Sequence, residues 1–174
     1  MKFYFHDAFM TAIISITGRS GSGKTTLIEG LIGHFSEKGL KISIIKHLRH
    51  EFQMDHPGKD TWRYREAGAG GAAIMNESEF AVTGRHGGTL DPRTLAERFF
   101  PDADLVIIEG DRESAIDKIE VIGDSAEQPL YRSGIANIIA LASDREIPSV
   151  LPLFKRDDVA GIGQFIEKKL FPGG

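Results

Sequence analysis

Apolar residues follow two patterns along this chain: short continuous runs, and longer segments in which they recur every three or four positions. Residues 12–17 (AIISIT) form a β-branched run that ends at a glycine, which predicts a buried strand. The next segment has helical spacing and stops at Gly39; its apolar residues are Leu27, Ile28, Leu31, Ile32 and Phe35. It predicts an amphipathic helix directly after the strand.

The same patterns continue along the rest of the chain. Further strands are predicted at residues 41–46, 72–76, 80–83, 105–109, 118–122 and 135–142. Further helices are predicted at residues 60–67, capped by Asp60, and at 94–100 and 159–170. Most of the strands are continuously apolar, which is typical of parallel strands buried on both faces. We therefore predict an α/β fold with a mostly parallel sheet flanked by helices, plus a small antiparallel hairpin at residues 72–83.

A length of 174 residues with 41% hydrophobic content predicts one folded domain. We assign residues 12–174 to this domain and residues 1–11 to an N-terminal extension. The first ten residues make a poor signal peptide, and no window approaches the ~20 apolar residues of a membrane span. We therefore expect a cytoplasmic protein without a membrane partner.

Composition narrows the chemistry further. The absence of cysteine excludes disulfides, thiolate zinc sites, iron–sulfur clusters and cysteine nucleophiles. The net charge of −4 argues against a nucleic-acid partner, so any anion must be bound locally. Glycine contributes 20 residues without a repeat, which indicates that particular backbone positions require it.

A phosphate-binding loop follows the first predicted strand. Residues 18–25 (GRSGSGKT) match G-x-x-x-x-G-K-[ST] between a strand and a helix, the context that this motif requires. Its glycines let backbone N–H groups surround a phosphate at the helix N-terminus. Lys24 would neutralise the β and γ oxygens, and Thr25 would hold Mg²⁺. We expect nucleotide contacts from Gly18, Arg19, Ser20, Gly21, Ser22, Gly23, Lys24, Thr25 and Thr26.

Such a loop needs a second acidic group at the end of a neighbouring strand, where it holds magnesium directly or through water. Glu109 ends the most apolar predicted strand, at the edge where ligands of open α/β sheets bind. Asp104 lies at the opposite end of that strand. Glu109 is therefore our candidate for catalysis and magnesium binding; the alternative is that it only terminates the strand.

The loop before residue 60 has the composition of a mobile segment. In a functional loop, Asp55 or Asp60 would support magnesium and Lys59 would add a cation near the γ-phosphate. The alternative is a solvated loop whose Asp60 only caps the next helix.

Basic residues and histidines follow the second predicted strand. The H-x-x-H spacing of His47 and His50 invites a metal interpretation, but cysteines and a helical H-E-x-x-H motif are absent. Anion binding is the more natural interpretation after a parallel strand. The residues concerned are Lys46, His47, Arg49 and His50.

Base recognition has a weaker pattern. Asp144 follows the predicted strand 135–142, where its carboxylate would accept the N1 and N2 hydrogens of guanine, a pair that adenine lacks. The usual Asn-Lys-x-Asp signature is absent, and an aspartate at this place is also typical of a turn. The aromatic residues are expected to pack in the core or against helices rather than to stack on a base: Trp62, Tyr64, Phe99 and Phe100.

Taken together, several motifs resemble the molybdopterin-guanine dinucleotide biosynthesis adapter family, MobB. They are GRSGSGKTTL, IKH at 45–47, DHPGKDTWRYREAGA at 55–69, LVIIEG at 105–110, KIEV at 118–121 and ALASD ending at Asp144. The resemblance covers most of the chain from residue 12 to about residue 144. The PGKD stretch followed by R-x-x-x-A-G-A is far more specific than the phosphate loop.

The resemblance implies a dimeric P-loop protein that binds GTP·Mg²⁺, hydrolyses it weakly and assists a separate molybdenum cofactor guanylyltransferase in joining GMP to molybdopterin. It also implies that Thr25 and Glu109 lie near magnesium and that the loop 55–60 is functional. After Glu109-Gly110 the family commonly continues with Phe-Lys, whereas this chain has Asp111-Arg112. Lys46, Arg49 and Arg112 would hold a second anion, such as the pterin phosphate.

Two other functions share these residues. A P-loop small-molecule kinase or ligase using ATP or GTP would need an acceptor hydroxyl and an acidic base in the cleft. A binding module would use the nucleotide without chemistry. The sequence shows no clear catalytic base or arginine finger, which predicts slow turnover unless Arg19 or Lys59 reaches the phosphates.

Overall fold

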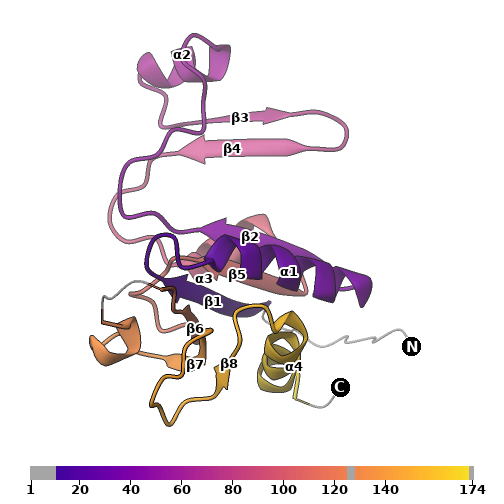
Figure 1. Cartoon of the computed structure of the whole chain (residues 1–174). Helices are drawn as coiled ribbons and strands as arrows, with labels where there is room; N and C mark the ends of the chain where they lie inside the picture. Colours follow the sequence, from indigo (N-terminus) through magenta and orange to yellow (C-terminus); the bar gives the residue numbers. More distant parts are fainter. Residues whose placement is uncertain (1–10, 125–127, 173–174) are drawn as a thin grey trace. The chain divides into compact units, whose positions relative to one another are not determined.

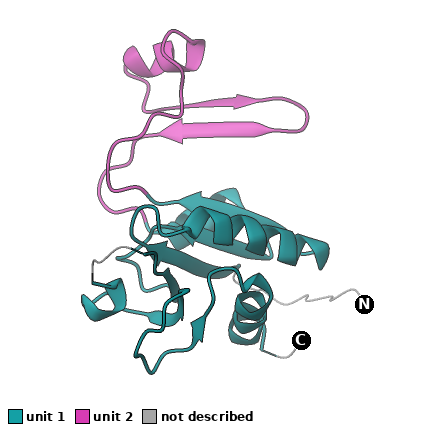
Figure 2. Ribbon diagram, viewed as in Figure 1, with its two compact units in different colours: residues 1–47, 91–174 teal, residues 48–90 magenta. Residues whose placement is uncertain are grey.

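The computed structural model describes residues 11–124 and 128–172, so the predicted extension at residues 1–11 lies outside the described residues except for Thr11. The chain forms two compact units (Figure 2). Unit 1 extends to His47 and resumes at Asp91; unit 2 comprises Leu48–Leu90. The assignment of residues 12–174 to a single P-loop domain stays a prediction.

Unit 1 is built on a six-stranded sheet in the order β2-β5-β1-β6-β7-β8, and every strand pairing in it is parallel (Figure 1). The strands are β1 (Ala12–Gly18), β2 (Ile42–Lys46), β5 (Leu105–Glu109), β6 (Lys118–Val121), β7 (Ile138–Ala142) and β8 (Leu153–Phe154). The helices are α1 (Lys24–Glu37), α3 (Pro92–Phe99) and α4 (Val159–Leu170), with a short 3₁₀ helix at Leu130–Arg132. This α/β arrangement confirms the predicted fold class.

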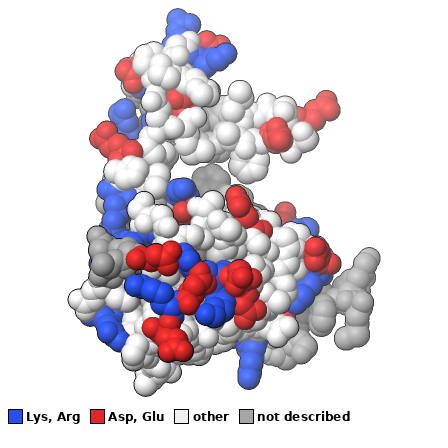
Figure 3. All heavy atoms as spheres, viewed as in Figure 1, with Lys and Arg blue, Asp and Glu red and all other residues white. Residues whose placement is uncertain are grey.

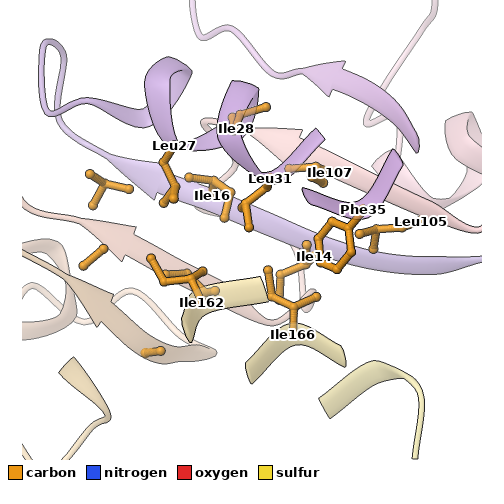
Figure 4. Packing of buried hydrophobic residues seen from close by; sticks show 14 residues of the cluster. Ile14, Ile16, Leu27, Ile28, Leu31, Phe35, Leu105, Ile107, Ile162 and Ile166 are labelled. Atoms are coloured by element: carbon orange, nitrogen blue, oxygen red, sulfur yellow. The ribbon is translucent and has the colours of Figure 1, made fainter. Parts of the chain in front are cut away.

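Helices cover both faces of this sheet because its central strands are apolar on both sides. One buried cluster joins Ile14, Ile16 and Ile107 to the inner faces of α1 and α4, as Figure 4 shows for Leu31, Phe35 and Ile162 among others. A second cluster packs Ala96 of α3 against the opposite face, where the neighbouring β1 and β5 side chains point. Because the strands are parallel, their carboxyl ends lie at one common edge of the sheet, and that edge carries the candidate site.

Unit 2 contains α2 (Asp60–Glu66) and an antiparallel hairpin of β3 (Gly71–Met75) and β4 (Phe80–Gly84). The hairpin confirms the predicted antiparallel pair. None of the residues of this unit is fully buried. Its exposed large apolar side chains are Phe52, Met54, Tyr64, Ile74, Met75, Phe80, Val82 and Leu90. Tyr64 is 61% exposed, so its predicted packing role is wrong.

Two local predictions are also wrong. Asp60 does not cap α2: the cap position is Lys59, and the carboxylate that organises this turn is Asp55, which accepts hydrogen bonds from Thr61 Oγ1 at 2.9 Å and His56 N at 3.0 Å. The strand predicted at 135–142 begins only at Ile138, because Asn137 has a left-handed backbone (φ 61°) that a strand cannot accommodate.

None of the helices in the part of the chain that the structure describes is long and apolar enough to cross a membrane. On the face shown in Figure 3, acidic and basic side chains are interspersed over unit 1. This mixture fits the small net charge of −4 and leaves local arrangement, rather than total charge, to create an anion site.

Candidate functional site

The phosphate-binding loop connects the central strand β1 to α1 at the carboxyl edge of the sheet. Its two flanking strands end beside it, since Gly18 pairs with Val121 of β6 and Ile16 pairs with Glu109 of β5. Gly18, Gly21 and Gly23 have φ values of 146°, 70° and 98°. These left-handed conformations favour glycine, so the loop requires the glycines that the motif supplies.

The N-terminus of α1 is open to an anionic ligand. Its cap residue Gly23 makes no side-chain hydrogen bond, and the first turn contains no acidic residue. The first backbone N–H groups of a helix have no acceptor within the helix, so those of α1 are available as donors. Ser22 adds a buried Oγ atom without a hydrogen-bond partner among the described residues. These features fit a bound phosphate.

Lys24 extends its amino group across the loop. Its Nζ atom donates a hydrogen bond to the carbonyl oxygen of Arg19 at 2.7 Å. Burial lowers the pKa of this amino group; the nearby charge of Glu109 raises it, while the cations Arg112 and Lys46 lower it. Lys24 therefore shares its surroundings with the cations Arg112 and Lys46 and with the carboxylate of Glu109. An anion bound here would relieve the repulsion among the cations.

The other charged groups of this cluster are held in place by contacts of their own. Arg112 donates from Nη2 to the carbonyl oxygen of Gly18 at 3.1 Å, so it lies against the start of the loop. Lys46 Nζ lies 3.5 Å from Glu109 Oε2. The residues predicted at the ends of β2 and β5 are therefore brought together beside the loop, as parallel pairing requires.

Two oxygen donors are available for the expected magnesium ion. Glu109 ends β5 with its side chain 14% exposed, and Thr25 is exposed in the first turn of α1. Carboxylate and hydroxyl oxygens are the hard ligands that Mg²⁺ prefers, and nucleotide phosphates and water usually complete its shell. The described residues contain no group of three or more histidine, aspartate or glutamate side chains arranged to hold a metal. The residues present thus fit Mg²⁺ carried by a phosphate ligand.

The remaining loop residues differ in exposure. Ser20, Gly21, Thr25 and Thr26 are exposed, whereas Ser22 is buried. Arg19 donates from Nε and Nη2 to the carbonyl oxygen of Gln128 at 3.3 and 2.9 Å, which directs its guanidinium to the segment before the 3₁₀ helix. Asp104 accepts from Lys41 N at the opposite edge of the sheet, as predicted.

Asp144 follows β7 on the same edge as the phosphate-binding loop. It is exposed and its carboxylate is paired with Arg156. The next residue, Arg145, donates to the carbonyl oxygen of Gly123 at 3.0 Å, and a Cβ atom on Gly123 would lie 3.0 Å from Ser22 Cα. The turn that carries Asp144 is therefore connected to the phosphate-binding loop through a single intervening residue.

Comparison with known proteins identifies the family. The sequence model described as "Molybdopterin guanine dinucleotide synthesis protein B" (MobB) matches residues 13–144. The chain belongs to the MobB family. The molybdopterin-guanine dinucleotide biosynthesis adapter protein of Haemophilus influenzae is 33% identical over 159 residues, covering 91% of this chain and 89% of that protein. The adapter protein of Escherichia coli is 31% identical over 161 residues, covering 90% and 92%.

Solved MobB structures have the same fold. A crystal structure of molybdopterin-guanine biosynthesis protein B matches with a TM-score of 0.72 and 30% identity, covering 91% of this chain and 99% of that one. A structure of Bacillus subtilis MobB matches with a TM-score of 0.72 and 27% identity, covering 92% and 99%. The resemblance predicted from the motifs is confirmed.

The residues predicted for this MobB site are divided between the two units. Unit 1 holds residues 18–26 together with Lys46, His47, Glu109, Arg112 and Asp144. Unit 2 holds Arg49, His50, Asp55, Lys59 and Asp60. Asp60 is exposed and lies 3.7 Å from Arg63 within its own helix. The expected roles of the unit 2 residues at magnesium and the γ-phosphate stay predictions.

A buried ion-pair network that the sequence did not predict lies beside the MobB site. Asp111 is 1% exposed and accepts from Ser114 Oγ at 2.5 Å and from the backbone N–H groups of Glu113 and Ser114. Lys118 Nζ and His47 Nδ1 each lie 3.5 Å from its carboxylate. Burial alone would raise the pKa of Asp111, but these hydrogen bonds and the charge of Lys118 outweigh it and hold the pKa below its usual value.

This network fixes the turn that presents Arg112 to the loop. The fully buried Lys118 also donates to the carbonyl oxygens of Ser114 and Ile116 at 2.6 and 2.7 Å. Glu120, two residues further along β6, accepts hydrogen bonds from Leu130 N and Tyr131 N at 2.6 and 2.8 Å. Burial raises the pKa of Glu120. One feature of the sequence indicates the buried charges of Lys118 and Glu120: β6 alternates charged and apolar residues (KIEV) although it is a central, buried strand.

We expect Lys118→Met to lower the free energy of unfolding by about 3 kcal/mol, because it leaves the Asp111 carboxylate buried without its cation. Chemical denaturation measures this loss. Lys169→Met is the matched control, since Lys169 is 49% exposed and pairs with Asp117 at 3.6 Å, an ion pair that contributes less than about 1 kcal/mol. Equal effects of the two substitutions would contradict a structural role of the buried pair.

Proposed function

We propose that this MobB family member is a cytoplasmic adapter in molybdopterin guanine dinucleotide biosynthesis that binds GTP·Mg²⁺ on residues 18–26 and hydrolyses it slowly. One observation carries the nucleotide part: the partly buried Lys24 amino group bridges a loop of left-handed glycines at an uncapped helix N-terminus. Membership of the family supports the adapter part.

The proposed roles follow from the contacts at the sheet edge. Lys24 neutralises the β and γ oxygens, and the N–H groups at the start of α1 donate to the β-phosphate. Thr25 and Glu109 hold Mg²⁺, which supplies additional neutralisation of the phosphate oxygens when bound. Asp144 accepts hydrogens from guanine, a role that its position on the turn joined to the loop supports.

Slow hydrolysis follows from the placement of the charged residues. Attack of water on the γ-phosphorus breaks the bond to the β–γ bridging oxygen and releases phosphate and GDP. Fast P-loop GTPases add an arginine finger to stabilise this charge. In this structure Arg19 donates to the carbonyl oxygen of Gln128 and Arg112 donates to that of Gly18, so neither is placed as an arginine finger for the γ-phosphate. The loop is therefore suited to binding more than to turnover.

We expect single turnover of γ-labelled GTP to release the label as inorganic phosphate, slowly and without transfer to another molecule. The assay follows the label by chromatography, with and without molybdopterin and with a mixture of small hydroxyl-bearing metabolites. Transfer of the label to a metabolite would contradict the adapter function and would establish the alternative, a small-molecule kinase or ligase.

The proposed partners are a molybdenum cofactor guanylyltransferase, molybdopterin and a second copy of this chain. Lys46 and Arg112 beside Lys24 support a second anion site for the pterin phosphate. The exposed apolar residues of the hairpin support a homodimer, because a two-stranded sheet is marginally stable without a partner. Ile74, Met75 and Phe80 are 63%, 80% and 62% exposed.

A further inference from the structure

We propose that Arg156 is a positioning residue for base recognition: it orients the Asp144 carboxylate toward guanine and transfers one of its own donors to Asp124 when the base binds. This inference rests on the proposed function, in which Asp144 reads guanine. Arg156 lies outside residues 13–144, the segment matched by the family model, so family membership does not assign it a role.

Arg156 holds the Asp144 carboxylate from two sides. Its backbone N–H donates to Oδ1 at 3.2 Å, and its Nε atom donates to Oδ2 at 2.6 Å. Its Nη2 atom also contacts Oδ2 of Asp144. Both carboxylate oxygens are therefore fixed by one residue, which follows β8 at the same edge of the sheet. The hydrogen bonds from Arg156 hold the pKa of Asp144 below its usual value, so the carboxylate is an acceptor only.

Counting acceptor positions shows why one contact must move. An ionised carboxylate has about four lone-pair positions, and the three Arg156 donors occupy three of them. The N1 and N2 groups of guanine bring two more donors, which makes five for about four positions. At least one Arg156 donor must leave when guanine binds, while the others can keep the carboxylate oriented.

Asp124 is in place to receive that donor. Its Oδ2 atom lies 3.5 Å from Arg156 Nη2, the same atom that contacts Asp144. A short movement of the guanidinium would replace one carboxylate by the other and leave no charge unpaired. Asp124 follows Gly123, the residue that packs on Ser22 of the phosphate-binding loop. The exchange therefore takes place between two turns that both adjoin the proposed nucleotide site.

Adenine cannot make the corresponding pair of hydrogen bonds to Asp144. It presents no pair of hydrogens complementary to a carboxylate, so the contacts of Arg156 with Asp144 would remain as they are. Arg156 should therefore affect the affinity for GTP and not the affinity for ATP. That difference separates a positioning role from a merely structural one, since loss of local structure would lower the affinity for both nucleotides.

The test measures GTP·Mg²⁺ and ATP·Mg²⁺ binding by calorimetry for the full chain and its variants. We expect Arg156→Ala to lower the affinity for GTP about tenfold, which is the effect of losing one charged hydrogen-bonded contact. The affinity for ATP should stay unchanged. Lys155→Ala is the matched control: it removes the neighbouring cation, whose Nζ donates to the backbone carbonyl of Asp144 rather than to its carboxylate. We expect this control to retain the GTP preference.

Two further variants test the mechanism. When Arg156→Ala is added to Asp144→Ala, it should cause no further loss of GTP affinity, because Arg156 acts through Asp144. Asp124→Ala should lower the affinity for GTP without changing the affinity for ATP, because the Arg156 donor that leaves Asp144 then has no second carboxylate to bind.

The outcomes separate this inference from the proposed function. An Arg156→Ala variant with undiminished preference for GTP, or additive losses in the double variant, would overturn the role of Arg156 and leave guanine recognition intact. Equal wild-type affinities for GTP and ATP would overturn guanine recognition itself and the inference with it.

Discussion

Lys24→Ala is expected to weaken GTP binding about 100-fold, equivalent to ~3 kcal/mol. The reason is that Lys24 supplies the cation that spans the loop, with its Nζ atom held at 2.7 Å from the carbonyl oxygen of Arg19. Because the amino group is partly buried, water would poorly replace the proposed contact of Lys24 with phosphate. Calorimetric titration with GTP·Mg²⁺ measures the change.

Lys168→Ala is the control for Lys24→Ala, since it removes an exposed lysine from α4. It should bind GTP as the wild type does. A Lys24→Ala variant that retains full GTP affinity would contradict the proposed site. The same variant separates two adapter mechanisms: if it still assembles with the guanylyltransferase, the chain does not need the nucleotide for partner binding.

Gly18→Ala is expected to lower the free energy of unfolding by about 3 kcal/mol or more, an effect in the range of severe backbone and packing changes. A Cβ atom at this position would lie 2.3 Å from the carbonyl oxygen of Val121 and 2.8 Å from Ser22 Oγ. The first contact is with the backbone of β6, which cannot move without disturbing the sheet. The φ value of 146° adds strain for any L side chain.

Gly33→Ala is the matched control for this substitution. Gly33 lies in the middle of α1, and a Cβ atom there would meet nothing within 4 Å. Alanine is the better helix former by about 1 kcal/mol, so the control should be stabilised. Chemical denaturation of both variants tests the comparison. A stable Gly18→Ala variant would contradict the close approach of the loop to β6.

The central sheet was predictable because it is buried on both faces. Leu105, Val106, Ile107 and Ile108 are all fully buried, and a continuous apolar run of this kind leaves an unambiguous pattern. The two-residue strand β8 and the short 3₁₀ helix were not predicted, since two or three residues do not form a period. The start of β7 was misplaced because Ile135 continues the apolar run, while the conformation of Asn137 ends the strand.

The site was predictable where a motif fixes local geometry. The glycines of residues 18–25 determine the backbone conformation of the loop. The position of Glu109 beside the loop follows from the pairing of β5 with β1. The supporting contacts were not predictable, because they follow no sequence motif or period. Lys118 reaches Asp111 across a turn, and Arg156, which follows β8, reaches Asp144, which follows β7. Such pairs depend on which strands are neighbours, and single-sequence patterns do not encode that order.

The most direct test of the account is calorimetric titration of the wild-type chain with GTP·Mg²⁺ and, separately, with ATP·Mg²⁺. We expect saturable binding of one GTP per chain and at least about tenfold weaker binding of ATP, because only guanine offers Asp144 two hydrogens. Binding of both nucleotides with equal affinity would contradict guanine recognition. Absence of binding to either would contradict the phosphate-binding loop as a nucleotide site and, with it, the central claim.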